Sequence, residues 1–355
     1  MTSLERVVTA LQFKEPDRVP VYPICSGVAR SLTGISYYDF ANNPRRAADA
    51  LIAVNSKLDL DIFCTLTDLS IEAADFGQEI LHPENEAAHP AHDNRLIKSI
   101  DDYKKIEPLP IKYAPRMKSH IEMCDILMKK VGKEYPVVAF IFGPLGITSM
   151  LRDQADLYLD LLDDPDAVKD AAKAITETII EYCDKLIETG VHAIMIDTLF
   201  ASASIMSKKM WLEFEGPYVE RIAKHIHDKG CMVMIHNCGN GIYFDVQIET
   251  MKPEAISFLY PPDDCKDFAE CKAKYGKQTA LIGCISPTWL PSASYEEVVE
   301  ESKREIDTFA SGGGYVLATG CEYPANLELK KAEAMAQTAK TYGQYSEINK
   351  RLRGE

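Results

Sequence analysis

One histidine and two cysteines of this chain have the types and positions of a metal-binding set. His236 and Cys238 are two residues apart at the end of a predicted strand, so an imidazole nitrogen and a thiolate on one side of it can reach the same ion. Cys321 is the third ligand that we predict, because it lies at the matching end of the last predicted strand. This set favours Zn²⁺ and leaves one coordination position open for chemistry. The alternative interpretation is structural, since cysteine is among the most buried residues and histidine can be a satisfied core group.

Three carboxylates near predicted strand ends are candidate catalytic residues. Asp68 follows the first predicted strand, Asp197 ends the fourth, and Glu322 is adjacent to Cys321. A carboxyl group in such a place can act as a general acid or base, or orient a ligand. For Asp68 and Asp197 the alternative is a cap on the helix that follows. For Glu322 the alternative is a side chain that faces solvent.

The elements that must position these residues alternate from about residue 60 onward. Short apolar runs rich in β-branched residues are separated by longer amphipathic stretches, which is the pattern of a parallel sheet with helical crossovers. The predicted strands are Asp61–Leu66, Glu79–Leu81, Val137–Phe142, Ala193–Asp197, Met232–His236, Ala255–Leu259, Ala280–Gly283 and Tyr315–Thr319. The predicted helices include Asp166–Thr189, Lys208–Asp228, Tyr295–Phe309 and Leu327–Tyr342.

Eight strands that alternate with helices predict an α/β fold, a (β/α)8 barrel of the TIM type. We expect one domain over residues 1–355, with residues 1–58 as an N-terminal helical extension and residues 59–345 as the barrel. An open doubly wound sheet is the alternative, but no glycine-rich G-x-G-x-x-G turn follows the first strand. Catalytic groups of such barrels lie at the carboxyl ends of the strands, which is where the candidate residues collect.

The composition excludes several classes of protein. A chain of 355 residues with 46% hydrophobic and 26% charged residues is typical of globular proteins. Its net charge of -15 is unfavourable for a nucleic-acid partner. No apolar run approaches the roughly 20 residues that span a bilayer, and the first residues lack a signal-peptide pattern. We therefore expect a soluble, cytoplasmic protein without a membrane partner, whose ten cysteines include reduced thiols rather than a disulfide framework.

Several short motifs resemble the uroporphyrinogen decarboxylase superfamily over nearly the full length of the chain. They are Arg18-Val19-Pro20-Val21, Gly143-Pro144, Leu281-Ile282-Gly283 with Pro287, and Gly312-Gly313-Gly314-Tyr315 with Pro324. The sequence departs from the decarboxylases near its start, where only Arg30 soon follows the first motif, too few cations for a substrate with many carboxylates. His236-x-Cys238 and Gly320-Cys321 instead resemble the zinc motif of the cobalamin-dependent methyltransferase branch, whose members include methylcobamide:coenzyme M methyltransferases.

This resemblance implies a zinc-containing methyltransferase that works with a corrinoid carried on a separate small protein. Zinc at His236, Cys238 and Cys321 would either activate a thiol towards methyl-Co(III) or polarise the oxygen of a methyl ether for transfer to Co(I). We favour O-demethylation of a methoxylated aromatic compound, because apolar side chains at the strand ends can enclose a ring. The candidates are Phe200, Met206, Phe258, Tyr260 and Tyr323. Each of them can equally fill the barrel rim.

Other functions remain open at this point. A methylcobamide:thiol methyltransferase of the coenzyme M type would use the same ligands in the other direction. A non-catalytic zinc barrel would need a fourth protein ligand, for which Cys284 and Glu322 are candidates. A metal-independent decarboxylase would use Asp68. The sequence also leaves the oligomeric state open, a homodimer included.

Overall fold

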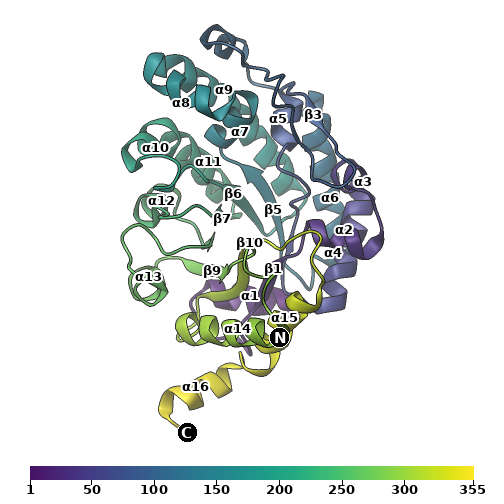
Figure 1. Ribbon diagram of the computed structural model, residues 1–355, viewed down its shortest axis with the longest axis vertical. Helices are drawn as coiled ribbons and strands as arrows, with labels where there is room; N and C mark the ends of the chain where they lie inside the picture. The colour runs from purple at the N-terminus through teal and green to yellow at the C-terminus, as the bar shows by residue number, and fades with distance from the viewer.

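Eight parallel strands form the centre of the molecule in the computed structural model, which describes residues 1–355 (Figure 1). Their order around the sheet is β1-β10-β9-β8-β7-β6-β5-β2, and helices lie outside the strands. The strands are β1 Val21–Ile24, β2 Phe63–Cys64, β5 Val137–Phe142, β6 Ala193–Asp197, β7 Met232–Asn237, β8 Ala255–Phe258, β9 Ala280–Ile285 and β10 Tyr315–Glu322. The strands form a nearly closed (β/α)8 barrel, which confirms the predicted fold class.

A buried carboxylate joins the first and last strands of this order. The backbone N–H of Asp61, just before β2, donates to the carbonyl of Val21 in β1 at 3.0 Å. The Asp61 carboxylate accepts from the Val21 N–H at 2.8 Å, from Arg18 at 2.7 Å and from Arg6 at 2.8 Å. The Asp61 side chain is fully buried. The seam of the barrel is therefore held by one carboxylate between two guanidinium groups.

The predicted helices Asp166–Thr189, Tyr295–Phe309 and Leu327–Tyr342 are confirmed, although the last begins three residues later than predicted. The predicted helix Lys208–Asp228 is wrong, because it is divided at Glu215 into two helices, the second of which has Pro217 in its first turn. Ser294 and Glu297 form a capping box at the start of α14, and Asp164 caps α9 ahead of Pro165. The α-helices are α1 Ser3–Leu11, α2 Gly27–Thr33, α3 Tyr37–Asn42, α4 Pro44–Leu58, α5 Ile71–Asp75, α6 Pro115–Val131, α7 Pro144–Leu151, α8 Gln154–Asp163, α9 Pro165–Glu188, α10 Lys208–Phe214, α11 Gly216–Asp228, α12 Phe244–Met251, α13 Phe268–Tyr275, α14 Tyr295–Phe309, α15 Lys330–Thr341 and α16 Tyr345–Arg353. Two 3₁₀ helices are η1 Ile100–Lys105 and η2 Ile111–Tyr113.

Two predictions about the strands are also wrong. The first barrel strand is β1, which lies inside the segment 1–58 that we expected to be a purely helical extension. It is only four residues long and contains Pro23, so it lacks the length and pattern of a typical strand. Glu79–Leu81 is not a barrel strand: β3 Ile80–Leu81 pairs antiparallel with β4 His89–Pro90 in a separate small sheet. Leu81 is exposed, as expected of a surface hairpin rather than a barrel strand.

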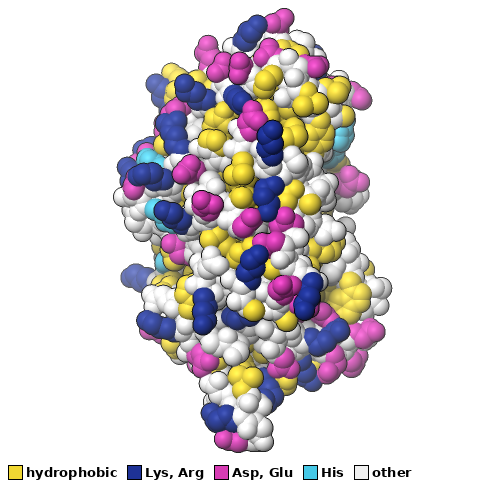
Figure 2. Space-filling view, turned by 90° about the vertical axis from the view of Figure 1, so that its left-hand side faces the viewer, with side chains coloured by type: hydrophobic (Ala, Val, Ile, Leu, Met, Phe, Trp, Pro, Cys, Tyr) yellow, Lys and Arg dark blue, Asp and Glu magenta, His cyan; other side chains and the backbone are white.

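The surface carries both signs of charge. In Figure 2, Lys and Arg side chains are interspersed with Asp and Glu over the face that is shown, with smaller hydrophobic areas between them. No helix of the structure is long and apolar enough to cross a bilayer. The strands beneath are buried along their length, since helices cover the outside of the sheet and side chains fill its inside.

Candidate metal centre and substrate cavity

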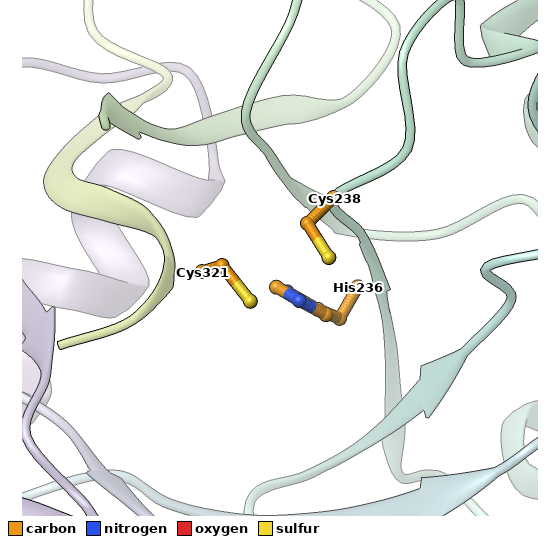
Figure 3. Close-up of side chains that lie close together, drawn as sticks. All are labelled: His236, Cys238 and Cys321. Atoms are coloured by element: carbon orange, nitrogen blue, oxygen red, sulfur yellow. The ribbon is translucent and has the colours of Figure 1, made fainter. Parts of the chain in front are cut away.

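The three predicted ligands meet inside the barrel. His236 lies in β7 and Cys238 directly follows that strand, so the alternation of an extended chain points both side chains inward. Cys321 comes from β10, and two other strands separate β10 from β7 in the sheet. One ligand atom from each residue lies within 4.8 Å of the others, and Figure 3 shows the three side chains directed towards one another. Curvature of the barrel therefore brings together residues that are far apart in the sequence.

A neighbouring strand fixes the orientation of the imidazole. His236 Nδ1 is joined to the hydroxyl of Ser257 by a hydrogen bond of 3.0 Å. Ser257 lies in β8 directly opposite His236 in the parallel register. This contact occupies one ring nitrogen and leaves Nε2 available for a ligand bond, the usual arrangement around a metal-binding histidine.

The electrostatics of the cluster favour a thiolate. Hydrogen bonding from the Cys238 thiol and from His236 lowers the pKa of Cys321 well below its usual value, although burial opposes this. Conversely, the hydrogen bond with Cys321 raises the pKa of Cys238, because that thiol keeps its proton beside the thiolate. Burial alone would lower the pKa of His236, but contact with the Cys321 thiolate raises it. A nitrogen and two sulfurs in this arrangement fit the donor set of a zinc site.

A small cavity of about 160 Å³ opens beside the cluster. Apolar side chains make up most of its wall, and no lysine or arginine contributes to it. Its lining residues are Tyr22, Ile24, Cys64, Leu66, Leu69, Phe140, Phe142, Met195, Asp197, Leu199, His236, Cys238, Cys321 and Glu322. A ligand in this cavity would contact the three predicted metal ligands on one side and an apolar wall on the others.

Two of the three predicted catalytic carboxylates also line the cavity. Asp197 ends β6 opposite His236, and its Oδ1 accepts a hydrogen bond of 2.9 Å from the Leu199 N–H. Burial raises the pKa of Asp197 to about 6. Glu322 accepts a hydrogen bond of 2.6 Å from the Gly27 N–H, and burial raises its pKa to about 7. Both can therefore hold or release a proton near neutral pH.

Asp68 does not reach the cavity. Its carboxylate accepts a hydrogen bond of 2.6 Å from Arg116 and another of 2.9 Å from the Ser70 N–H. The side chain is only 1% exposed and is occupied by these contacts. The alternative interpretation, a cap on the following helix, is not seen either, because Ser70 is the N-cap of α5 and Asp68 stabilises the turn before it. Cys284 is also absent from the cluster of His236, Cys238 and Cys321.

All five aromatic and apolar residues predicted to enclose a substrate ring lie outside the cavity lining. Phe200 and Met206 are buried in the core, and Tyr260 is 39% exposed. Tyr323 is fully buried, and its hydroxyl donates to the carbonyl of Glu328. Phe258 is buried too, at 5.0 Å from the ring of Phe244 in α12. It points outward because its neighbour Ser257 points inward.

The apolar residues of the wall were missed, although the two-residue period of a strand contains the signal for several of them. Three wall residues each precede another inward residue by two positions: Phe140 precedes Phe142, Met195 precedes Asp197, and Tyr22 precedes Ile24. Since side chains two apart share one face of a strand, the predicted sites could have been extended backwards along each strand. For Tyr22 this would have required β1, which the sequence did not predict.

Comparisons with known proteins give a consistent family. The profile of the family "Uroporphyrinogen decarboxylase (URO-D)" matches residues 2–342. The methylcobamide:CoM methyltransferase MtaA of Methanosarcina barkeri is 24% identical over 95% of this chain and 97% of its own. The uroporphyrinogen decarboxylase of Helicobacter pylori strain P12 is 21% identical over 85% of this chain and 86% of its own.

A solved structure described as a methyltransferase from Methanosarcina mazei has the same fold. It superposes with a TM-score of 0.76 at 20% identity, and covers 96% of this chain and 99% of its own. The similarity extends through the barrel and the elements around it, and it agrees with the fold class argued from the strands.

Proposed function

Because this chain belongs to the uroporphyrinogen decarboxylase family, we propose that it is a zinc-dependent methyltransferase that works with a corrinoid protein. It would move a methyl group between a small substrate and the cobalt of a corrinoid on a separate small protein. The observation that carries this proposal is the convergence of His236, Cys238 and Cys321 on one wall of an apolar cavity. The names of the methyltransferase relatives support it. We further propose that residues 1–355 form one domain and that the enzyme is cytoplasmic.

The donor set favours this reaction over decarboxylation. Two cysteines and a histidine are typical ligands of a soft or borderline metal ion. A substrate with many carboxylates would instead need lysine or arginine side chains, and neither lines the cavity. The decarboxylase hypothesis also depended on Asp68, which is paired with Arg116 outside the cavity. A closed structural zinc site would need a fourth protein ligand, and Cys284 does not join the cluster.

Zinc, when bound, supplies a Lewis acid for the sulfur or oxygen that exchanges the methyl group. His236, Cys238 and Cys321 would hold it, with the imidazole oriented by Ser257. The apolar wall excludes water from the reacting atoms. Asp197 and Glu322 line the cavity and would deliver a proton to the substrate heteroatom or remove one from it. Demethylation would break the O–CH₃ bond and transfer the methyl group, without the electron pair of that bond, to the Co(I) corrinoid of the partner protein. The substrate oxygen would keep the electron pair and take a proton.

We favour a methoxylated aromatic substrate, since Tyr22, Phe140 and Phe142 offer aromatic faces and edges to a ring. The second candidate is a thiol acceptor of the coenzyme M type, which is favoured by the names of the relatives MtaA and MtbA. That candidate is weakened by the lack of a lysine or arginine to pair with a sulfonate in the cavity.

Absorption spectroscopy of a corrinoid tests the proposal. The protein is mixed with Co(I) corrinoid and a methoxylated aromatic, and separately with methyl-Co(III) corrinoid and a thiol. We expect conversion between the two cobalt states in the first mixture, and none with the Cys321→Ala variant. A change of cobalt state only in the mixture of methyl-Co(III) corrinoid and thiol would favour the thiol methyltransferase instead. No conversion in either mixture by a zinc-loaded protein would contradict the methyltransferase function.

A further inference from the structure

One buried hydroxyl in the cavity wall has only a weak partner. Tyr22 is 4% exposed, and its Oη faces the Cys64 thiol and makes no hydrogen bond to a nitrogen or oxygen of the protein. Tyr22 and Ile24 lie two apart on β1 and both line the cavity, so the Tyr22 side chain points into the barrel. Its titratable neighbours are the thiols of Cys64 and Cys25 and the carboxyl group of Glu322, of which Cys64 and Glu322 also line the cavity. A thiol is a weak hydrogen-bond partner, and buried polar groups are nearly always well hydrogen-bonded, so this hydroxyl points to a ligand in the cavity.

The backbone of Tyr22 lies at a deeper level of the barrel than the strand end that carries Cys321 and Glu322. In the register of β1 with β10, Tyr22 pairs with Ala318, whereas Ile24 pairs with Glu322, next to Cys321. A molecule that reaches both levels would therefore place one end at His236, Cys238 and Cys321 and present another group to Tyr22.

The charge of the wall excludes an anion as the preferred ligand. The only lining residues of charged type besides the predicted metal ligands are Asp197 and Glu322, both acidic. A Zn²⁺ ion bound by two thiolates would have no net charge. It would therefore not offset the negative charges of Asp197 and Glu322. A carboxylate or sulfonate on the ligand would thus lose its hydration without gaining a cationic partner.

The shape of the wall suits a single ring. Phe140 and Phe142 meet edge to face with their centroids 5.8 Å apart, and the Phe140 ring lies 5.9 Å from the ring of His236. The cavity of about 160 Å³ is close in size to an engineered protein cavity of about 150 Å³ that binds benzene. A larger fused or polyanionic ring system would not fit this volume.

We propose that the cavity selects a small uncharged aromatic ring with two oxygen substituents, a methoxyphenol without a carboxylate, and that Tyr22 determines this specificity. The methoxy oxygen lies at the metal ligands, and the second oxygen exchanges a hydrogen bond with the Tyr22 hydroxyl. This inference rests on the proposed methyl transfer for the orientation of the ring, and it names the substrate class of the same site.

Calorimetric binding to the whole protein tests it with three probes. They are 2-methoxyphenol, methoxybenzene, which lacks the second oxygen, and 4-hydroxy-3-methoxybenzoate, which adds a carboxylate. We expect 2-methoxyphenol to bind most tightly. Tyr22→Phe should weaken it about 3- to 10-fold and leave methoxybenzene unchanged, because only one hydrogen bond is lost. Tyr260→Phe, outside the cavity, should change neither affinity.

Tighter binding of the benzoate, or equal affinities in wild type and Tyr22→Phe for every probe, would overturn the inference. The comparison of the three probes on the wild-type protein needs no variant, so it tests the substrate class even if Tyr22→Phe does not fold.

Metal content and methyl transfer are measured on the same preparations, so that the substrate class and the proposed function are tested separately. Methyl transfer with anionic thiols alone would leave the proposed function standing and overturn the substrate class. Selective binding of 2-methoxyphenol that depends on Tyr22, without zinc or methyl transfer, would support the substrate class and refute the function.

Discussion

At the scale of single residues, the site depends on what surrounds the metal ligands as much as on the ligands themselves. Ser257 occupies Nδ1 of His236, and hydrogen bonds from Cys238 and His236 favour the thiolate form of Cys321. Each contact orients a donor atom or prepares its charge before an ion arrives. Such supporting contacts usually matter for metal affinity nearly as much as the ligands.

Ser257→Ala should therefore weaken zinc binding while the three ligands remain. We expect a loss of about 10- to 100-fold in affinity, since the imidazole loses the partner that fixes its orientation. Competition with a chromophoric chelator measures the affinity. Ser292→Ala is the matched control, because that hydroxyl contacts only the Trp289 carbonyl in an exposed turn. Equal affinity in Ser257→Ala and the control would show that the hydrogen bond does not orient the ligand.

At the scale of elements, closure of the barrel places β10 opposite β7. The sheet ends at β1 and β2, and the Asp61 carboxylate joins them through the Val21 N–H, Arg6 and Arg18. A seam that opened would move β1, and with it Tyr22, away from the cavity. The integrity of the site is thus linked to a buried ion network at the other end of the strands.

Asp61→Asn should destabilise the protein strongly. The change keeps the size of the side chain but leaves the buried Arg18 guanidinium without a carboxylate, whereas Arg6 keeps its ion pair with Asp17. Breaking a buried pair by removing one partner typically costs about 3–5 kcal/mol. Urea denaturation followed by circular dichroism measures the free energy of unfolding. Asp59→Asn serves as the control, because Asp59 is 60% exposed and pairs with Lys340 at the surface, a contact worth at most about 1 kcal/mol. Similar losses in both variants would mean that the seam is not held by Asp61.

At the scale of the whole molecule, the sequence predicts the architecture and the metal ligands because both depend on local pattern. Strand period places His236 and Cys238 on one face, and the alternation of strands and helices favours a barrel, whose closure brings Cys321 close to them. The cavity wall depends on non-local closure instead. Tyr22 escaped prediction because β1 is short and contains Pro23, and its pairing with β10 is determined by the complete sheet.

A buried carboxylate makes the stability of the whole molecule dependent on pH. Glu72 in α5 is buried and accepts from the Phe142 N–H, and burial raises its pKa from 4.5 to about 8. The protonated form is therefore favoured by folding, so this contribution is complete below about pH 4.5 and is lost as the pH rises through about 8.

Glu72→Gln should abolish that dependence. The free energy of unfolding of wild type minus that of the variant should fall between pH 6 and pH 9 by more than about 1.4 kcal/mol, the equivalent of one pKa unit. Urea titrations at both pH values measure this difference. A difference that does not change with pH would show that Glu72 is ionised in the folded protein at pH 6.

Metal analysis by plasma mass spectrometry tests most directly whether His236, Cys238 and Cys321 form a zinc site. The wild type is compared with Cys238→Ala, Cys321→Ala and the control Cys265→Ala, each checked for folding by circular dichroism. Cys265 is partly buried and lies outside the cluster. We expect one zinc per chain in the wild type and the control, and none in the other two variants. A folded wild type that takes up no zinc, or retention of zinc by both cluster variants, would contradict the proposed metal centre.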